Sequence, residues 1–401
     1  MNNKTKGAGV GLLIALVLVG FVMRSQVTTL PLILDDIAIT LHVQSGDLGI
    51  ITTIPLVMFM LVSNFASKTV QLIGLKKALM GSLLLICAGS DLRIVPSFSA
   101  MIGGTILIGL GVAHLNVLMP AFLMEYAPNK IALYTSAYSF SMMFGVAVFN
   151  LLTAHIVYTA GLPTMMFVLF SVPAIALLTW IVVTWRLQAA KQDEGANPET
   201  KQENKPIKVW TKIKAWPFLL VFGGQSLINY TFVAWMPSLM SFHHLTATQI
   251  GIAMSMKAFI GMPMSMIIPN LLVRSKQRGI VNSMLVVGSL GLIGALMLFF
   301  QDTSSMIFWS IECLISGIIT SFFYMSLMTL FAVKTSSPMA SASLAGMAQT
   351  GGYLMAATGP ILYGMAFQAN PTGSIQNIIY VLVIIMLTAM GLFVAKSTKF
   401  E

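Results

Sequence analysis

The sequence predicts an all-α membrane protein in which twelve transmembrane helices form two six-helix repeats. Three observations lead to this class. The 401 residues are 57% hydrophobic and only 8% charged, whereas about a quarter of the residues of a soluble domain are charged. Twelve apolar runs are each long enough to cross a hydrocarbon core about 30 Å thick as a helix. One polar segment separates six of these runs from the other six.

The first six runs follow one another through short connections. No small-residue cleavage site follows the first run, so we interpret it as a retained helix rather than a signal peptide. Helices are expected because each one satisfies its own backbone N–H and C=O groups in lipid, and the runs are too long and too uniformly apolar for barrel strands. The predicted spans cover residues 8–34, 47–67, 75–96, 98–124, 131–158 and 163–187.

The polar segment after the sixth run is rich in Lys, Glu, Gln, Asn and Pro, as expected of a solvated linker. We therefore divide the chain into an N-terminal half (1–187), a cytoplasmic linker (188–213) and a C-terminal half (214–401). The predicted spans of the second half cover residues 214–241, 248–273, 279–300, 304–332, 338–367 and 374–395.

The two halves repeat each other weakly. Gly49 in GDLGIITTIPLVMF corresponds to Gly251 in TQIGIAMSMKAFIG, and Pro31 corresponds to Pro237, at offsets that agree to within one helical turn. Parallel six-span repeats are an architecture of secondary transporters, in which the substrate site lies between the halves near the middle of the bilayer.

The net charge of +10 reports the orientation of the chain in the membrane. Nineteen of the 22 Lys and Arg residues fall on the side of the predicted N-terminus, and the exceptions are Arg24, Arg93 and Lys257. This asymmetry follows the positive-inside rule and places both termini in the cytoplasm. We expect a multi-pass protein of a bacterial cytoplasmic membrane in contact with the lipid bilayer, and no nucleic-acid partner.

Several chemical functions are disfavoured by what the sequence lacks. The chain has no GxxxxGK[ST] phosphate loop, and its five histidines have no metal-ligand spacing. Cys87 and Cys313 fall inside predicted spans, so no disulfide framework is expected. We expect no enzyme activity, no cofactor and no metal site, and a monomer driven by an existing gradient.

Arg24 is the first candidate substrate-binding residue. Its face of the helix carries Gly20, Phe21, Thr28 and Pro31, mostly small or hydroxylated neighbours. A central Arg costs roughly 2.5–3.5 kcal/mol on insertion scales, so it is rarely kept without a use. A guanidinium presents a planar fork of donors that matches carboxylate-like anions. The alternative is an Arg that reaches the interface and has a structural role.

Lys257 and Glu312 are the ionisable residues deep in the second half, at compatible depths. One interpretation pairs them, which leaves Arg24 as the uncompensated charge. The alternatives are a substrate-binding Lys257 and a Glu312 that couples transport to protons. His114 is the other titratable coupling candidate, although a histidine between helices is usually structural.

Polar side chains at helical spacing complete the candidate site. Gln225 and Asn229 lie four residues apart, as do Gln349 and Tyr353, so each pair shares one helix face. Asn116 is favoured over His114 because it shares a face with small residues, and the two are about 200° apart around the helix. Tyr138 is a candidate aromatic wall of the site.

Six separated blocks of sequence, in order, resemble one family. The blocks MRSQVTTLPLILDDI, GIITTIPLVMF, LICAGSDLRIV, HLNVLMPAFLMEYAPNKIALYTSAYS, QSLINYTFVAWMPSLM and SLAGMAQTGGYLMAATGPILYG are similar to the cyanate and nitroimidazole permease branch of the major facilitator superfamily. The resemblance implies a twelve-helix alternating-access carrier of a small, often anionic or planar polar compound. The residues within matching motifs are Arg24, Arg93, Asn116, Pro120, Gln225, Gln349 and Tyr353.

The resemblance also identifies departures and gate candidates. Lys257 and Glu312 stand where the branch is expected to be uncharged. The basic signature between spans two and three is reduced to KTVQLIGLKK, which keeps Lys76 and Lys77 as inner-gate candidates. Arg93 and Asp91 are either an outer gate or a surface ion pair, and we favour the surface pair.

The predicted function is therefore secondary active transport of a small anion, such as cyanate, nitrate or a small carboxylate, or of a nitroheterocycle. The alternative is an exporter of neutral planar heterocycles or drugs, in which Arg24 is structural and Met and aromatic side chains bind the substrate. The sequence leaves open the identity of the substrate, the direction of transport and its coupling to protons.

Overall fold

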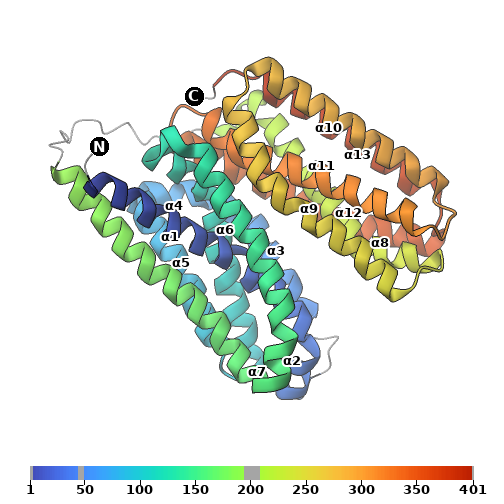
Figure 1. The fold of residues 1–401 in the computed structure, drawn as a ribbon, viewed down its shortest axis with the longest axis horizontal. Helices are drawn as coiled ribbons and strands as arrows, with labels where there is room; N and C mark the ends of the chain where they lie inside the picture. Colours follow the sequence, from blue (N-terminus) through green and yellow to red (C-terminus); the bar gives the residue numbers. More distant parts are fainter. Residues whose placement is uncertain (1–2, 44–48, 194–207, 400–401) are drawn as a thin grey trace. The chain divides into compact units, whose positions relative to one another are not determined.

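The computed structural model describes residues 3–43, 49–193 and 208–399, and nearly all of them are helical (Figure 1). Contacts divide the chain into two compact units, and each is described by itself. The first comprises Met1–Lys130 with Ala137–Ile207, and the second comprises Ile131–Ser136 with Lys208–Glu401. The part of the predicted linker at 194–207 lies outside the described residues.

The first unit contains the helices of the N-terminal half. Its helices of eight or more residues are α1 (Asn3–Thr28), α2 (Leu34–Leu41), α3 (Gly49–Val62), α4 (Ala66–Ile73), α5 (Leu75–Leu92), α6 (Phe98–Tyr126) and α7 (Ile131–Asp193). Short 3-10 turns join α1 to α2 and α3 to α4, so two helices make up the second predicted span. α7 consists of two helices, one for each of two predicted spans, which meet in a kink at Gly161, where φ is +82°. Such a positive φ is readily adopted by glycine.

The second unit contains the helices of the C-terminal half, one for each predicted span. They are α8 (Trp216–Phe242), α9 (Ala247–Arg274), α10 (Gln277–Met297), α11 (Met306–Val333), α12 (Pro338–Ala369) and α13 (Ser374–Lys396). α8 packs most extensively on α12, and α9 on α11, while α10 packs on α13. These contacts place α11 among α8, α9 and α10, where its side chains are the most deeply buried.

The apolar lengths of the helices agree with a membrane fold. Ten described helical stretches are long and apolar enough to cross a bilayer. The remaining two predicted spans form α5 and α12, which are continuous helices of 18 and 32 residues. α5 is less apolar because it carries Lys76, Lys77 and Asp91 near its ends, and α12 is rich in Gly, Ala, Ser and Thr.

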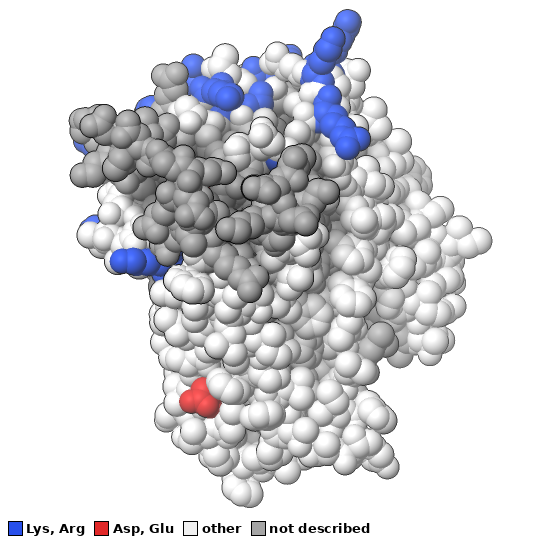
Figure 2. Space-filling model, turned by 60° about the vertical axis from the view of Figure 1, so that its left-hand side comes forward, with Lys and Arg blue, Asp and Glu red and all other residues white. Residues whose placement is uncertain are grey.

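Charged residues separate toward the helix ends. On the face shown in Figure 2, most Lys and Arg side chains lie toward the top, and the surface below them is almost uncharged, apart from one acidic patch near the lower left. In the C-terminal half, Arg274, Lys276 and Arg278 surround the turn between α9 and α10, whereas Asp302 follows α10 at its other end. An uncharged band between charged ends is what the bilayer requires of a spanning bundle.

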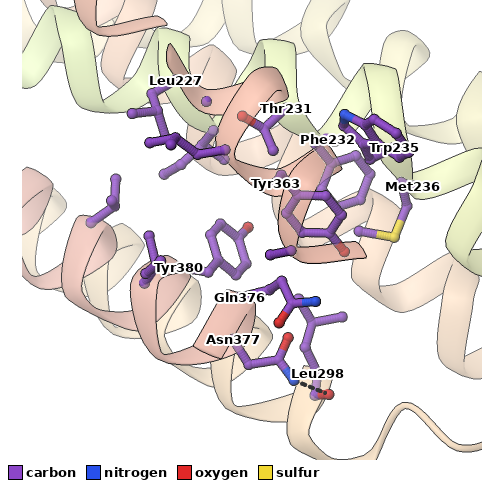
Figure 3. A pocket seen from close by; sticks show the side chains of 16 residues that line it. Leu227, Thr231, Phe232, Trp235, Met236, Leu298, Tyr363, Gln376, Asn377 and Tyr380 are labelled. Carbon is purple, nitrogen blue, oxygen red and sulfur yellow. Dashed lines mark hydrogen bonds between the residues drawn. The ribbon is translucent and has the colours of Figure 1, made fainter. Parts of the chain in front are cut away.

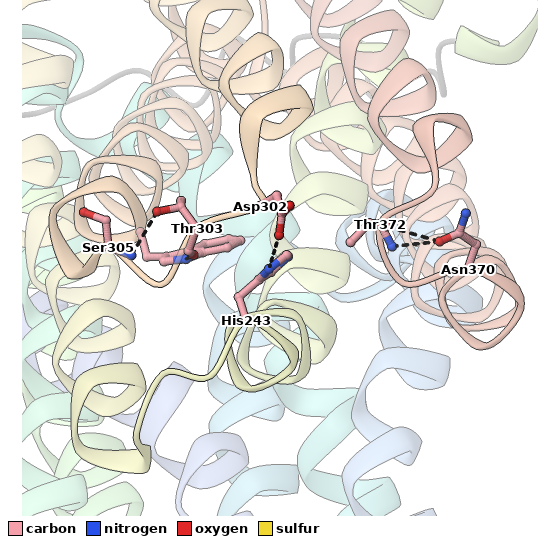
Figure 4. Close-up of polar contacts among 7 residues, drawn as sticks. His243, Asp302, Thr303, Ser305, Asn370 and Thr372 are labelled. Carbon is pink, nitrogen blue, oxygen red and sulfur yellow. Dashed lines mark hydrogen bonds and ion pairs between the residues drawn. The ribbon is translucent and has the colours of Figure 1, made fainter.

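The connections at the end that carries Asp302 are held by short polar contacts (Figure 4). His243 Nδ1 lies 3.8 Å from Asp302 Oδ1. Burial lowers the pKa of His243 even though Asp302 acts in the opposite direction, so the ring is neutral at pH 7. Thr303 Oγ1 accepts from the Ser305 N–H at 3.1 Å. These contacts hold the connections between the helices in place. The contact between His243 and Asp302 is not a strong ion pair, because the His243 ring is neutral.

A capping box begins α9, and its loss is expected to be measurable. Thr246 Oγ1 accepts from the Gln249 N–H at 3.3 Å, and Gln249 Oε1 accepts from the Thr246 N–H at 2.9 Å. We expect Thr246→Ala to lower the free energy of unfolding by about 1 kcal/mol, because the helix loses this N-cap. Unfolding in detergent micelles measures the change. Thr248→Ala, at an exposed threonine in the same turn, is the control, and an equal loss in both variants would contradict the prediction.

Candidate functional site

The candidate residues of the N-terminal half lie on α1, α6 and α7. Arg24 is half-buried near the C-terminal end of α1, and its carbonyl oxygen accepts from the Thr28 hydroxyl at 3.0 Å. Asn116 on α6 and Tyr138 on α7 are buried, with exposed fractions of 7% and 2%. α1 and α7 lie in direct contact, because a Cβ at Gly20 would collide with the Tyr138 carbonyl oxygen. Gly20, a small neighbour of Arg24 on the same helix face, therefore allows α1 and α7 to pack closely.

Arg93 is buried, so the favoured prediction of a surface ion pair with Asp91 is wrong. The Arg93 side chain is 3% exposed. Its Nε and Nη2 donate to Thr105 Oγ1 at 3.2 and 2.9 Å, and its Nη1 donates to the Gln26 carbonyl oxygen at 3.0 Å. Asp91 is exposed, because neighbours two apart on a helix point in different directions. Arg93 joins α5 to α6 and α1, and a role as an outer gate stays a prediction.

Gln26 is a residue that the sequence analysis missed. It is fully buried, and its Nε2 donates to the Leu169 carbonyl oxygen at 2.7 Å while its Oε1 accepts from the Ser90 hydroxyl at 3.0 Å. Together with Arg93, Gln26 fixes the segment of α1 that carries Arg24 against α5 and α7. The sequence does contain a signal for it: a polar Gln stands two residues after Arg24 in an otherwise apolar run.

The remaining candidates of this half make local contacts between helices. His114 Nε2 lies 3.2 Å from Thr69 Oγ1 on α4, and its Nδ1 lies 3.0 Å from the Leu110 carbonyl oxygen, which is the contact expected of a structural histidine. The Lys76 Nζ lies 4.8 Å from the centre of the Tyr126 ring. Lys77 is exposed. Coupling by His114 and gating by the two lysines stay predictions.

In the C-terminal half, Lys257 is held by an amide. Its Nζ donates to Asn229 Oδ1 at 2.7 Å and lies 5.5 Å from the centre of the Phe232 ring. Within the described residues no ion pair joins Lys257 to Glu312, so the predicted pair is absent. The two residues have similar depths but belong to α9 and α11, and they point to different neighbours. A cation on a neutral amide keeps its charge available to an anion.

Glu312 is the most isolated ionisable group in the described part of this half. Its side chain is 0% exposed, and neither carboxyl oxygen has a hydrogen-bond partner among the described residues. The α10 backbone lies against it, since a Cβ at Gly294 would stand 3.3 Å from Glu312 Oε2. An ionised carboxylate is strongly disfavoured in such surroundings.

The other polar candidates of the C-terminal half are buried between helices. The Gln225 amide donates to the Ser226 hydroxyl at 2.6 Å. Gln349 and Tyr353 lie on α12 with exposed fractions of 0% and 6%, and Tyr353 packs edge-on against the Phe222 ring at 5.1 Å between centres. Their burial here is compatible with packing and gives no direct evidence of substrate contact.

An apolar cavity of about 110 Å³ lies within the C-terminal half, between α8, α12 and α13. Figure 3 shows Phe232, Trp235, Tyr363 and Tyr380 around it, with Thr231 on one side and the amides of Gln376 and Asn377 on another. The Trp235 indole N–H is already bonded to the Pro360 carbonyl oxygen at 2.8 Å. An engineered apolar cavity of about 150 Å³ binds benzene, so this cavity is close to the size of one small ring.

Two helical units with apolar surfaces and buried cations, amides and carboxyl groups define a polytopic membrane transporter. Residues 12–360 match the family model of the Major Facilitator Superfamily, and the chain belongs to this family. The predicted fold class and the prediction of a transporter rather than an enzyme are confirmed.

The relatives indicate the branch within the family. The chain is 28% identical to the 2-nitroimidazole transporter of Escherichia coli (strain K12), over 97% of this chain and 96% of that protein. It is 22% identical to the cyanate transport protein CynX of the same organism, over 57% of this chain and 58% of that protein. These matches confirm the predicted branch. The fold is similar to that of the proton:xylose symporter XylE, with a TM-score of 0.70 at 12% identity, over 96% of this chain and 94% of that one.

Proposed function

We propose that the chain is a secondary active transporter that moves a small anionic or planar polar solute across the cytoplasmic membrane by alternating access. Rocking of the two halves, 1–187 and 214–401, would expose the substrate to one side at a time. Both termini would lie in the cytoplasm, on the side where the basic residues gather. Arg24 is the proposed anchor for the charged or polarised group of the substrate.

The observation that carries this proposal is the distribution of charge. Lys257 is bonded to an amide rather than a carboxylate, and Glu312 is positioned where a negative charge is strongly disfavoured. Among the described residues of the C-terminal half, Lys257 therefore carries a positive charge that Glu312 does not neutralise. A buried cation bonded to a neutral amide favours an anionic or electron-rich substrate.

The polar side chains supply the remaining recognition. Asn116 and Tyr138 in the N-terminal half, and Gln225, Asn229, Gln349 and Tyr353 in the C-terminal half, are proposed to bond the neutral edge of the substrate. The named substrates of the relatives, 2-nitroimidazole and cyanate, are both small and planar or linear with electronegative atoms. The planar guanidinium of Arg24 carries several N–H donors that can bond to such atoms.

A second candidate function is export of neutral planar heterocycles. The aromatic cavity of Figure 3 favours it, because its described lining has no charged side chain and its size suits a small ring. In that case binding would depend on the cavity and would be insensitive to Arg24.

Removal of the Arg24 guanidinium is expected to weaken anion binding by about 10- to 100-fold, because a hydrogen-bonded charged group contributes about 1.5–3 kcal/mol. Thermal stabilisation of the purified protein by cyanate, nitrate and 2-nitroimidazole measures binding. Arg24→Ala and Arg24→Lys should both lose the response, because a lysine cannot make the bidentate contact.

Arg278→Ala is the matched control, since Arg278 is exposed at the start of α10, and it should bind like the unmodified protein. Stabilisation by 2-nitroimidazole that survives Arg24→Ala would favour the second candidate function. Uptake of each stabilising compound into proteoliposomes then tests transport itself.

A further inference from the structure

The Glu312 carboxyl lies in the interior of the C-terminal half without a hydrogen-bond donor. The side chain is fully buried, and both carboxyl oxygens are unbonded within residues 208–399 and the other described segments. Transfer of an ionised carboxylate into such an environment costs far more than transfer of a neutral acid. The conformation shown therefore requires a compensating positive charge at this position.

The α10 backbone closes one side of the Glu312 carboxyl. Gly294 brings the α10 backbone onto the carboxyl, and a Cβ there would already stand 3.3 Å from Oε2 and 2.7 Å from Ile315 Cγ2. Among the described residues, no group of three or more His, Cys, Asp or Glu side chains could hold a metal ion. A hydrated cation needs several oxygen ligands, whereas a proton needs only the carboxyl itself.

Two hydroxyl groups, on α11 and α13, lie near the carboxyl. Ser316 is one turn further along α11, and Tyr380 approaches from α13, near Ser316 and within electrostatic range of Glu312. The two hydroxyls lie next to each other, and within the described residues neither bonds to the carboxyl. Tyr380 also lines the cavity between α8, α12 and α13 (Figure 3). Hydroxyls at this depth are available to bond to the carboxyl if it moves or ionises.

The titratable groups around Glu312 come from three helices. α11 itself provides Cys313, which lies within electrostatic range of both Glu312 and Lys257. α9 provides Lys257, whose Nζ is directed to Asn229 of α8, and α13 provides Tyr380. α10 presents the backbone at Gly294. Among these groups Glu312 is the only carboxyl.

We infer that Glu312 is a proton-binding site in the C-terminal half, occupied in the conformation shown. Binding adds one H⁺ to a carboxylate oxygen and removes one negative charge, and no other bond changes. Release needs a rearrangement that brings water or a donor to the carboxylate, and the hydroxyls of Ser316 and Tyr380 are neighbouring groups that can donate to it. Resting on the proposed function, the inference names the proton as the coupling ion, because a proton held in only one conformation links its gradient to the conformational change.

Infrared spectroscopy of the whole protein in lipid vesicles tests the protonation directly. At neutral pH the unmodified protein should show the C=O stretching band of a protonated carboxyl group, and Glu312→Gln should lack it. Glu125→Gln is the matched control, because Glu125 is exposed at the end of α6 and should leave the band unchanged. The same band in all three proteins, or loss of a carboxylate band in Glu312→Gln, would overturn the inference.

Two further variants keep the test informative if Glu312→Gln does not fold. Ser316→Ala and Tyr380→Phe retain the acid and remove a neighbouring hydroxyl, so each should move the frequency of the band without abolishing it. A sodium site is the competing explanation. It would be shown, and the inference overturned, if NaCl but not KCl stabilises the protein and this effect is lost in Ser316→Ala.

Proteoliposomes separate the proton site from the proposed function. Stimulation of uptake by a pH gradient should be present in the unmodified protein and in Glu125→Gln and absent in Glu312→Gln. Uptake in Glu312→Gln that keeps its pH stimulation would refute coupling through Glu312. Failure of every anion and heterocycle to be transported would refute the proposed function, while the infrared result would still decide the protonation.

Discussion

Gly317→Ala is expected to destabilise the protein by about 3 kcal/mol, at the upper end of the usual cost of overpacking. A Cβ at Gly317 on α11 would stand 2.7 Å from the Lys257 carbonyl oxygen on α9 and would collide with the Ile260 side chain. A backbone carbonyl inside a helix cannot turn aside, so α9 and α11 must separate. Unfolding of the purified protein in detergent micelles measures the loss.

Gly251→Ala is the control for helix propensity. Gly251 lies on α9, and a Cβ there would meet open space, so alanine should stabilise this helix by up to about 1 kcal/mol. The two variants make the same chemical change on the two helices that pack together, with opposite expected signs. Equal stabilisation in both would mean that α9 and α11 are not in direct backbone contact.

The fold was largely predictable because the bilayer restricts the choice of structure. Length, apolarity and the position of the basic residues are sufficient to define the spans, and each predicted span is helical. The break between the fifth and sixth spans was also predictable: the spans 131–158 and 163–187 leave a gap that contains Gly161, where the backbone departs from helical geometry with φ of +82°.

The candidate site was less predictable because depth along a helix does not give its rotation. Lys257 and Glu312 were placed at similar depths, but tertiary packing directs Lys257 to Asn229 and leaves Glu312 against Gly294. Arg93 shows the same limit. Its proximity to Asp91 in the sequence suggested a surface pair, whereas its bonds go to Thr105 and Gln26 on other helices. A single sequence contains no direct record of such contacts.

The buried network of the N-terminal half positions the helix that carries Arg24. Arg93 holds the Gln26 carbonyl, and Gln26 holds Ser90 and Leu169. This network stops the end of α1 from rotating, so the direction of Arg24 is fixed by residues that need not touch a substrate. Lys257 receives comparable support from Asn229 and Phe232 in the other half. Substrate recognition is therefore expected to depend on supporting residues as well as on the cations.

Thr105→Val is expected to destabilise the protein by about 3 kcal/mol, because it leaves two N–H groups of a buried cation without an acceptor. Thr105 Oγ1 accepts from both Nε and Nη2 of Arg93, and the guanidinium is 3% exposed. Valine has nearly the same shape, so the loss reports the polar contact rather than a cavity. Unfolding in detergent measures it, and Thr153→Val, at another fully buried threonine that bonds one turn back along its helix, is the control.

The cause of that loss is isolated by removing the cation as well. Arg93→Met should cost only about 1 kcal/mol, because replacing a buried charge by an apolar side chain also removes its desolvation cost. The double variant Arg93→Met with Thr105→Val should then be no less stable than Arg93→Met alone, which corresponds to a coupling of about 3 kcal/mol between the two positions. Additive losses would show that Thr105 stabilises the helices independently of Arg93, and that the guanidinium has other partners when the threonine is absent.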